Sequence, residues 1–153
     1  MNIMCRVLFI PLIGLLCAGC TGGTWLHSYK SLPKEGWERR DTVCFAVPQA
    51  EEDISGTLTI GLRLTAPVGS QDIVLAVEQS LEAPAAYRCD TVRCTLTDAE
   101  GYALGQGVNI IQYETPHVPF HLSKGQSGTV RIRHLMTDET VTGITELGLK
   151  VSR

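Results

Sequence analysis

The stretch TLTIGLRLT, residues 57–65, alternates apolar and polar residues without a break. Four aliphatic residues would share one face of a strand, namely Leu58, Ile60, Leu62 and Leu64. The threonines and Arg63 would share the other face, because successive side chains in a strand point to opposite sides. The stretch therefore predicts a β-strand with one face in a hydrophobic core.

The same period of two recurs along most of the chain. It predicts further strands at 42–47, 72–79, 88–97, 108–113, 119–122, 129–136 and 147–151. Glycine- and proline-rich turns separate these runs, and no run of ten or more residues shows a helical stripe. The sequence therefore predicts an all-β fold, a single antiparallel β-sandwich of jelly-roll or immunoglobulin-like type. Its expected core consists of Val43, Phe45, Leu58, Ile60, Leu62, Leu64, Leu75, Val77, Val92, Leu96, Val130, Ile132, Leu147 and Leu149.

The first nineteen residues have the pattern of a secretion signal. A single positive charge, Arg6, precedes the uncharged apolar run VLFIPLIGLLCAG, residues 7–19. Thirteen residues are too few to cross a bilayer core, which needs about 20. A positive start, a short apolar run and small residues at its end are typical of a signal peptide that is removed on export. We therefore assign residues 1–19 to a signal peptide.

Small residues directly before Cys20 indicate lipid attachment. Cys17, Ala18 and Gly19 precede this cysteine and resemble the bacterial lipobox, although Leu16 lies one position from the usual leucine. The alternative is an ordinary signal peptide with an incidental cysteine. We expect Cys20 to carry a lipid anchor of palmitate-like acyl chains, with residues 20–40 as a tether and 41–153 as the folded domain. A lipoprotein with two or three acyl chains stays on the membrane.

Three cysteines remain after the signal and the lipidated residue are counted. They are Cys44, Cys89 and Cys94. An exported protein can form disulfides. The candidate disulfide joins Cys44 to Cys89, and a bond from Cys44 to Cys94 is the second possibility. The alternative is three free, half-buried thiols. Cys89 and Cys94 would point to opposite faces of one strand and could not bond to each other.

No catalytic or metal-binding arrangement is evident. His117 and His121 are four residues apart, but Pro116 and Pro119 exclude a regular helix. In an extended chain, four residues span ~13 Å, too far for two ligands of one metal ion. Serine occurs without the G-x-S-x-G turn of many hydrolases. We therefore expect a non-enzymatic protein without metal or cofactor.

Exposed aromatic residues would be the feature of a carbohydrate-binding sandwich. Tyr87, Tyr102 and Tyr113 are the candidates for such a ligand or partner surface. Nucleic acid is an unsuitable partner, because the formal net charge is −3 for the whole chain and no run of basic residues occurs beyond Arg39 and Arg40.

Several motifs occur in the order found in a known family. Together they resemble the gliding-motility lipoprotein family GldH of the Bacteroidetes, over nearly the whole mature chain. They are Cys20, Tyr29-Lys30-x2-Pro33, Gly36-Trp37, Asp41, Phe45, Leu62-Arg63, Asp90-Thr91, Asp98-x2-Gly101, Gly105-x-Gly107, Ile132-x-His134-x-Met136 and Gly143-Ile144-x2-Leu147-Gly148.

The chain departs from the family pattern after Arg63. The family usually has an aromatic-rich stretch with an asparagine there, whereas this chain has Pro67–Asp72. If that stretch contacts a partner in the family, the contact is lost or changed in this chain.

The resemblance implies a lipoprotein of the outer membrane that supports gliding and related secretion machinery. We expect a binding or scaffolding module that contacts envelope proteins. Surface-directed lipoproteins of the Bacteroidetes often have acidic residues directly after the cysteine, and none follows Cys20 before Glu35. We therefore expect the domain to face the periplasm. The alternative function is a surface carbohydrate-binding module.

Overall fold

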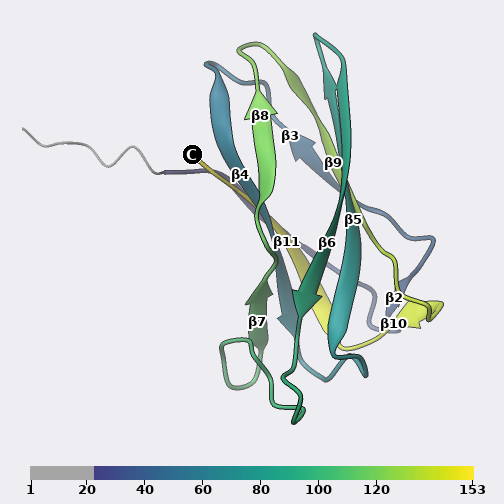
Figure 1. Ribbon diagram of the computed structural model, residues 1–153. Coiled ribbons are helices and arrows are strands. Elements are labelled where there is room, and N and C mark those ends of the chain that lie inside the picture. Colours follow the sequence, from purple (N-terminus) through teal and green to yellow (C-terminus); the bar gives the residue numbers. More distant parts are fainter. Residues whose placement is uncertain (1–22) are drawn as a thin grey trace, which may run out of the picture.

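The computed structural model describes residues 23–153 and contains only strands, turns and loops there (Figure 1). No helix in this part of the chain could span a membrane. The signal peptide and Cys20 lie outside the described residues. The strands are β1 (Thr24–Ser31), β2 (Trp37–Glu38), β3 (Val43–Val47), β4 (Ile54–Leu64), β5 (Asp72–Glu82), β6 (Ala86–Thr95), β7 (Ile111–Glu114), β8 (Val118–Leu122), β9 (Ser127–His134), β10 (Thr140–Val141) and β11 (Ile144–Ser152).

Two antiparallel sheets face each other and confirm the predicted β-sandwich. One has the order β1-β11-β4-β7, with β8 also paired to β4, and the other has the order β3-β9-β5-β6. In Figure 1 the first sheet lies on the left and the second on the right. If β7 and β8 count as one interrupted strand and the small β2–β10 pair is set aside, consecutive strands alternate between the sheets in the manner of a jelly roll, except for the β5–β6 hairpin, which lies within one sheet. The strand order therefore favours the jelly roll over the seven-stranded immunoglobulin fold.

The core forms as the alternation in the sequence predicts. Leu58, Ile60, Leu62 and Leu64 of β4 are all buried, and Leu62 has no exposed surface. Of the fourteen predicted core residues, thirteen are buried, and Val43 is half-buried against them. Strand β4 is central in its sheet, between β11 and the β7/β8 strand. The stretch that predicted the fold therefore lies at its centre.

The expected tether over residues 20–40 is wrong from Thr24 onward. Strand β1 pairs with β11 over its whole length, and β2 pairs with β10. The alternation in β1 is obscured by a register shift between Thr24 and Leu26 and by its place at the edge of the sheet. Trp37 is completely buried. The folded domain therefore already includes the residues from Thr24 onward, well before residue 41.

An interruption separates β7 from β8. Residues Ile111–Glu114 and Val118–Leu122 pair with β4 in registers that differ by one residue, which marks a bulge. Thr115 bridges it, since its backbone N–H donates to the Ile60 carbonyl at 2.9 Å and its Oγ1 accepts from the Ile60 N–H at 3.0 Å. The predicted strand at 108–113 begins only at Ile111, so Val108 lies in the preceding loop.

Candidate functional site

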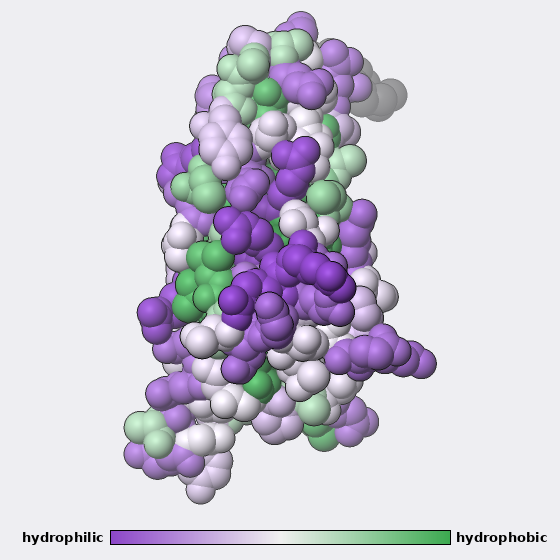
Figure 2. Space-filling model, turned by 90° about the vertical axis from the view of Figure 1, so that its right-hand side faces the viewer, coloured by the Kyte–Doolittle hydropathy of each residue, from purple (hydrophilic) through white to green (hydrophobic). Residues whose placement is uncertain are grey.

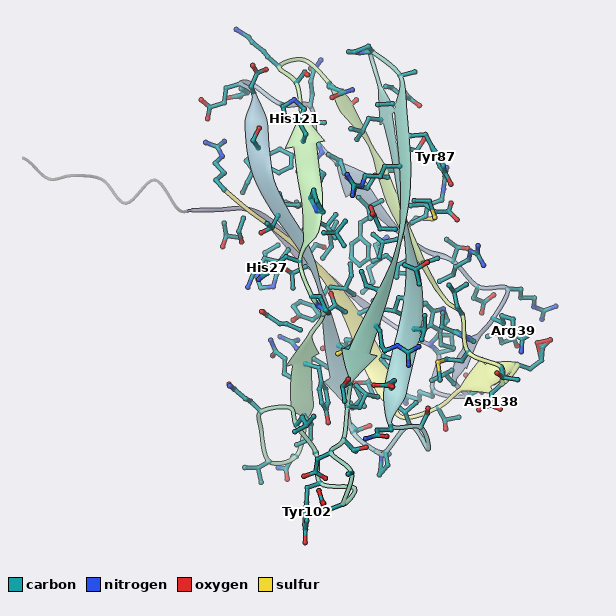
Figure 3. The ribbon with its side chains drawn as sticks, in the orientation of Figure 1. His27, Arg39, Tyr87, Tyr102, His121 and Asp138 are labelled. Carbon is teal, nitrogen blue, oxygen red and sulfur yellow. The ribbon has the colours of Figure 1, made fainter. Side chains whose placement is uncertain are left out.

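The three tyrosines proposed as a ligand surface are not brought together. Tyr87 on β6 and Tyr102 in the following loop are both exposed, but they lie toward opposite ends of the sandwich (Figure 3). Tyr113 on β7 is buried. A sugar ring stacks on neighbouring aromatic faces, so this arrangement offers no shared platform.

The three cysteines are free thiols in the structure. Cys44, Arg131, Glu78 and Cys89 form one row across four neighbouring strands. Three strand spacings separate the two thiols by about 14 Å, which is too far for the candidate Cys44–Cys89 disulfide. Cys94 points into the core, where burial raises the pKa of its thiol to about 11. Cys94 therefore remains protonated and unreactive.

The two histidines of the 117–121 segment have separate partners. His117 Nδ1 lies 2.8 Å from Thr59 Oγ1, and His121 Nδ1 lies 2.8 Å from Ser55 Oγ. Within residues 23–153 no three His, Cys, Asp or Glu side chains are grouped in a way that could hold a metal ion. The Ser55–His121 pair is exposed, and no carboxylate of residues 23–153 hydrogen-bonds to His121. The pair therefore lacks the third group of a catalytic triad.

Tyr29 on β1 lies across two glycines on the outer face of its sheet. A Cβ atom on Gly61 would lie 2.6 Å from the Tyr29 hydroxyl, and one on Gly148 would lie 2.5 Å from the ring carbon Cε1. The Arg63 guanidinium stacks on the ring, with Cζ 3.9 Å from its centroid, and its Nη1 is 2.7 Å from Glu146 Oε2. Three of the motifs quoted above therefore meet here to hold β1 onto the sheet.

Another group of the quoted motifs meets around His134, which has no exposed surface. Its Nε2–H donates to the Trp37 carbonyl at 3.0 Å, and the Trp37 ring meets the imidazole edge-on at a centroid distance of 5.2 Å. The Trp37 Nε1–H donates to the Asp41 carbonyl at 2.9 Å. The His134 Nδ1 is buried without a hydrogen-bond partner in the described chain. These contacts fasten the β2 segment to β9.

Burial lowers the pKa of His134 below its ordinary value of 6.5, and the positive charge of Arg39 lowers it further. The bond to the Trp37 carbonyl and the charges of Glu139 and Asp138 act in the opposite direction. Below pH 6.5 His134 is therefore protonated in the unfolded chain but stays neutral in the folded chain until a lower pH. Stability is fully present above this pH and falls as the pH decreases.

We expect the free energy of unfolding to decrease between pH 7.5 and pH 5.5, as measured by urea titration at each pH. His134→Phe should flatten this dependence, because the substituted ring has no proton to bind. His121→Phe, which alters an exposed imidazole, serves as the control and should keep the wild-type slope. Equal slopes in wild type and His134→Phe would contradict the assignment.

The loop between β6 and β7, residues 96–110, exposes most of the large apolar side chains found on the surface. Its members are exposed by 50% to 94% and define the loop patch: Tyr102, Leu104, Val108 and Ile110. Only Tyr87 and Leu135 are comparable elsewhere in residues 23–153. Exposed apolar side chains that lie together on a surface mark interaction sites.

Hydrogen bonds to backbone N–H groups order this loop. Asp98 Oδ1 accepts from the backbone N–H groups of Glu100 at 3.1 Å and Tyr102 at 2.8 Å. Gln106 and Gln112 exchange two backbone bonds of 3.0 and 2.8 Å. Gly107 has φ +132°, and a Cβ atom there would lie 1.9 Å from the Ile110 carbonyl oxygen. The loop patch is therefore presented on an ordered backbone, which lowers the entropic cost of binding.

A cleft of about 390 Å³ opens beside the loop patch. It is lined mainly by the 96–110 loop, the β4–β5 connection and the start of β7, with the apolar residues Pro67, Val68, Ala103, Val108 and Ile111 among them. The β4–β5 connection, residues 65–71, is uncharged, and Asp98 and Glu100 are the only charges at 96–110. Val108 is the member of the loop patch that lines the cleft. The 96–110 loop lies at the lower end of the sandwich in Figure 1, far from Thr24.

Sequence reasoning found this surface only in part. The glycines at 101, 105 and 107 predicted a loop, but the expected strand at 108–113 concealed the exposure of Val108 and Ile110. The alternation signal for that strand was short, and the tight turn at Gly107 delays its start by three residues, to Ile111.

Comparisons with known proteins place the chain in a family. Its sequence matches the family model described as "GldH lipoprotein" over residues 24–151, from the first residue of β1 into β11. No curated protein matches it.

Two solved structures show a distant similarity to this chain. A CocE/NonD family hydrolase from Staphylococcus aureus is 12% identical, with 83% of this chain and 32% of that chain covered and a TM-score of 0.40. Eiger TNF from S. frugiperda is 7% identical, with 82% and 91% covered and a TM-score of 0.35. This chain spans about a third of the hydrolase's length, and likenesses this distant carry no argument about function. The match to the family model covers nearly all of the described residues, and the chain therefore belongs to the GldH lipoprotein family.

Proposed function

We propose that this envelope lipoprotein is a non-catalytic binding module, held at the outer membrane by lipid on Cys20, with its domain in the periplasm. Family membership fits a lipoprotein associated with gliding motility and its secretion machinery. The proposed partners are envelope proteins, and the proposed contact is the loop patch with its adjoining cleft. The observation that carries the proposal is the ordered exposure of four large apolar side chains on one loop.

The position of the surface supports this role. The chain enters the fold at Thr24, beside the last residues of β11, whereas the loop patch lies at the other end of the sandwich (Figure 1). A membrane attached through residue 20 therefore leaves the loop patch open to a partner. Pro67 and Val68 belong to the segment where this chain departs from the family pattern, and both line the cleft. Partner preference should accordingly differ between this chain and relatives with the aromatic-rich stretch.

The carbohydrate-binding alternative has less support. Its candidate rings are scattered, since Tyr87 and Tyr102 lie toward opposite ends and Tyr113 is buried. The loop patch contains one aromatic ring and three aliphatic side chains, which suits a protein surface better than a sugar.

A crosslinked pull-down from envelopes tests the binding surface. Val108→Asp places a charge on a side chain that is 94% exposed, so the domain should fold normally while the partner is lost. Leu135→Asp alters an exposed apolar side chain outside the loop patch and should keep the partner. Retention of the same partners by Val108→Asp would contradict the proposed contact.

The anchor is tested separately by labelling with a palmitate analogue. Cys20→Ser should lose the label and leave the membrane fraction. If label and fractionation are unchanged, Cys20 is not the lipidated residue.

A further inference from the structure

Strand β6 is an unpaired edge of its sheet. Among residues 23–153 it pairs only with β5, over ten residue pairs from Asp72–Thr95 to Leu81–Ala86. Edge strands expose a row of backbone donors and acceptors that can pair with another chain. Pro116 and Pro119 interrupt the β7/β8 edge, and a register shift interrupts β1. Strand β6 contains neither device.

The hydrogen-bond pattern identifies which backbone groups of β6 are free. The Val74 carbonyl of β5 accepts from the Leu135 N–H at 2.8 Å, so Val74 faces the β9 side. Its neighbours Ile73 and Leu75 then face β6, where they pair with Cys94 and Val92. The even-numbered residues of β6 therefore bond to β5. The odd-numbered ones, from Tyr87 to Thr95, direct their N–H and C=O groups to the open edge.

We propose that two copies of this chain pair along β6, antiparallel, about a two-fold axis at Cys89. This register sets Tyr87 opposite Thr91 of the second copy, Arg88 opposite its Asp90, and Cys89 opposite its own equivalent. Each hydrogen-bonded pair exchanges two backbone bonds, so the pairs at 87, 89 and 91 supply about six. The two sheets join into one continuous sheet.

Charge complementarity selects this register. Arg88 and Asp90 point to the same side of the strand and already bond within one copy, at 2.6 and 2.9 Å. In the dimer each faces the opposite charge of the other copy. A register centred on residue 88 would set two arginines against each other, and one centred on 90 would set two aspartates against each other. Like charges directly opposite are unfavourable, so only the centre at Cys89 satisfies both residues.

The pairing also accounts for an exposed aromatic ring. Tyr87 is 68% exposed and lies at the end of the molecule away from the loop patch. Opposite a threonine in the second copy it forms an aromatic–β-branched pair, one of the favourable cross-strand combinations. Figure 2 shows hydrophilic side chains through the middle of the outer face to which Tyr87 belongs, so this face is unsuited to an apolar partner. Pairing along the edge leaves that face in water.

The symmetry is compatible with two lipid anchors in one membrane. A two-fold axis that relates two antiparallel paired strands is perpendicular to their sheet. Rotation about it therefore leaves the second sheet of each copy on the same face of the joined sheet. Strand β1 belongs to the other sheet. Both copies therefore enter the fold on the same face of the dimer, and because the paired strands run in opposite directions the two 96–110 loops lie at opposite ends of it.

Charge reversal tests the pairing in the full-length lipoprotein, extracted in detergent and examined by native mass spectrometry. Arg88→Asp alone and Asp90→Arg alone each set like charges together and should weaken dimerisation about tenfold or more. The double exchange should restore the dimer. When the two single variants are co-expressed with different tags, they should co-purify as a mixed dimer, because one copy is then all acidic and the other all basic at these positions.

An oxidant tests the axis directly. Copper phenanthroline with oxygen should remove two electrons and two protons from a pair of Cys89 thiols, whose Cα atoms in a hydrogen-bonded pair are about 5.5 Å apart. Cys44, which is also exposed but lies on the opposite edge of the same sheet, is the control. A chain that retains Cys44 and carries Cys89→Ser should stay monomeric on a non-reducing gel.

Three results would overturn the proposal. They are a monomeric wild type that gives no Cys89 crosslink, a failure of the mixed single variants to associate although each melts at the wild-type temperature, and a Cys89 crosslink only to a different protein. The last result would assign the β6 edge to a strand from another chain. These outcomes are independent of the loop patch, because Val108→Asp should leave dimerisation intact.

Discussion

Leu62→Asp is expected to unfold the domain. Leu62 is completely buried in β4, between Leu147 of β11 and Tyr113 of β7. The substitution removes about 1.5–3 kcal/mol of burial and places a carboxylate in the hydrophobic core, at a cost of several kcal/mol. Domains of this kind are stable by only about 5–15 kcal/mol. The variant should therefore lack a cooperative unfolding transition.

Thr57→Asp is the matched control, because it introduces the same charge on the outer face of the same strand, where Thr57 is half-exposed. Circular dichroism during thermal unfolding should show a transition for Thr57→Asp and none for Leu62→Asp. A soluble and cooperatively folded Leu62→Asp protein would show that the face assignment of β4 is wrong.

Trp37→Ala is expected to destabilise the domain by about 3–5 kcal/mol, the usual cost of truncating a buried tryptophan. The substitution removes the edge-on contact with His134 and the hydrogen bond to the Asp41 carbonyl. It also empties a place in the core beside the short β2–β10 pair. Amide hydrogen exchange should therefore accelerate first at Arg39, whose N–H donates to the Glu139 carbonyl beside this pair at 2.8 Å.

Trp25→Ala provides the comparison, because Trp25 is only half-buried, with its ring 6.2 Å from that of Phe120. Denaturant titration should rank the loss of stability at Trp37 well above that at Trp25. If the two variants lose the same stability, the segment before residue 41 does not contribute a core side chain. The start of the folded domain would then lie closer to residue 41.

The central strands were predictable because their two faces meet different surroundings. Residues 57–65 alternate cleanly, since one face of β4 meets the apolar core. The other face has half-exposed Thr57 and Arg63, a buried polar Thr59 and the Tyr29 ring over Gly61. Strand β1 has a neighbour on one side only and a register shift near its start, so its burial does not alternate and its sequence resembled a tether. The β2–β10 pair is two residues long on each side, too short for any period to appear.

The functional surface was less predictable than the fold. The motifs at Tyr29, Arg63 and Gly148 were visible as letters, but only the folded sheet brings the ring over the two glycines. Likewise, Trp37 and His134 are 97 residues apart in sequence. The exposure of Val108 depends on where β7 begins, and a turn at Gly107 decides that point. Contacts between distant segments leave no periodic trace in a single sequence.

The pairing of β1 with β11 has a consequence for biogenesis. Strand β11 lies between β1 and β4, so this sheet cannot close until residues 144–152 have left the ribosome. Most of the contacts join distant parts of the chain, and such topologies fold slowly because long loops must close first. A nascent chain of this kind stays unfolded while it is translated, which is the state that a translocation channel accepts.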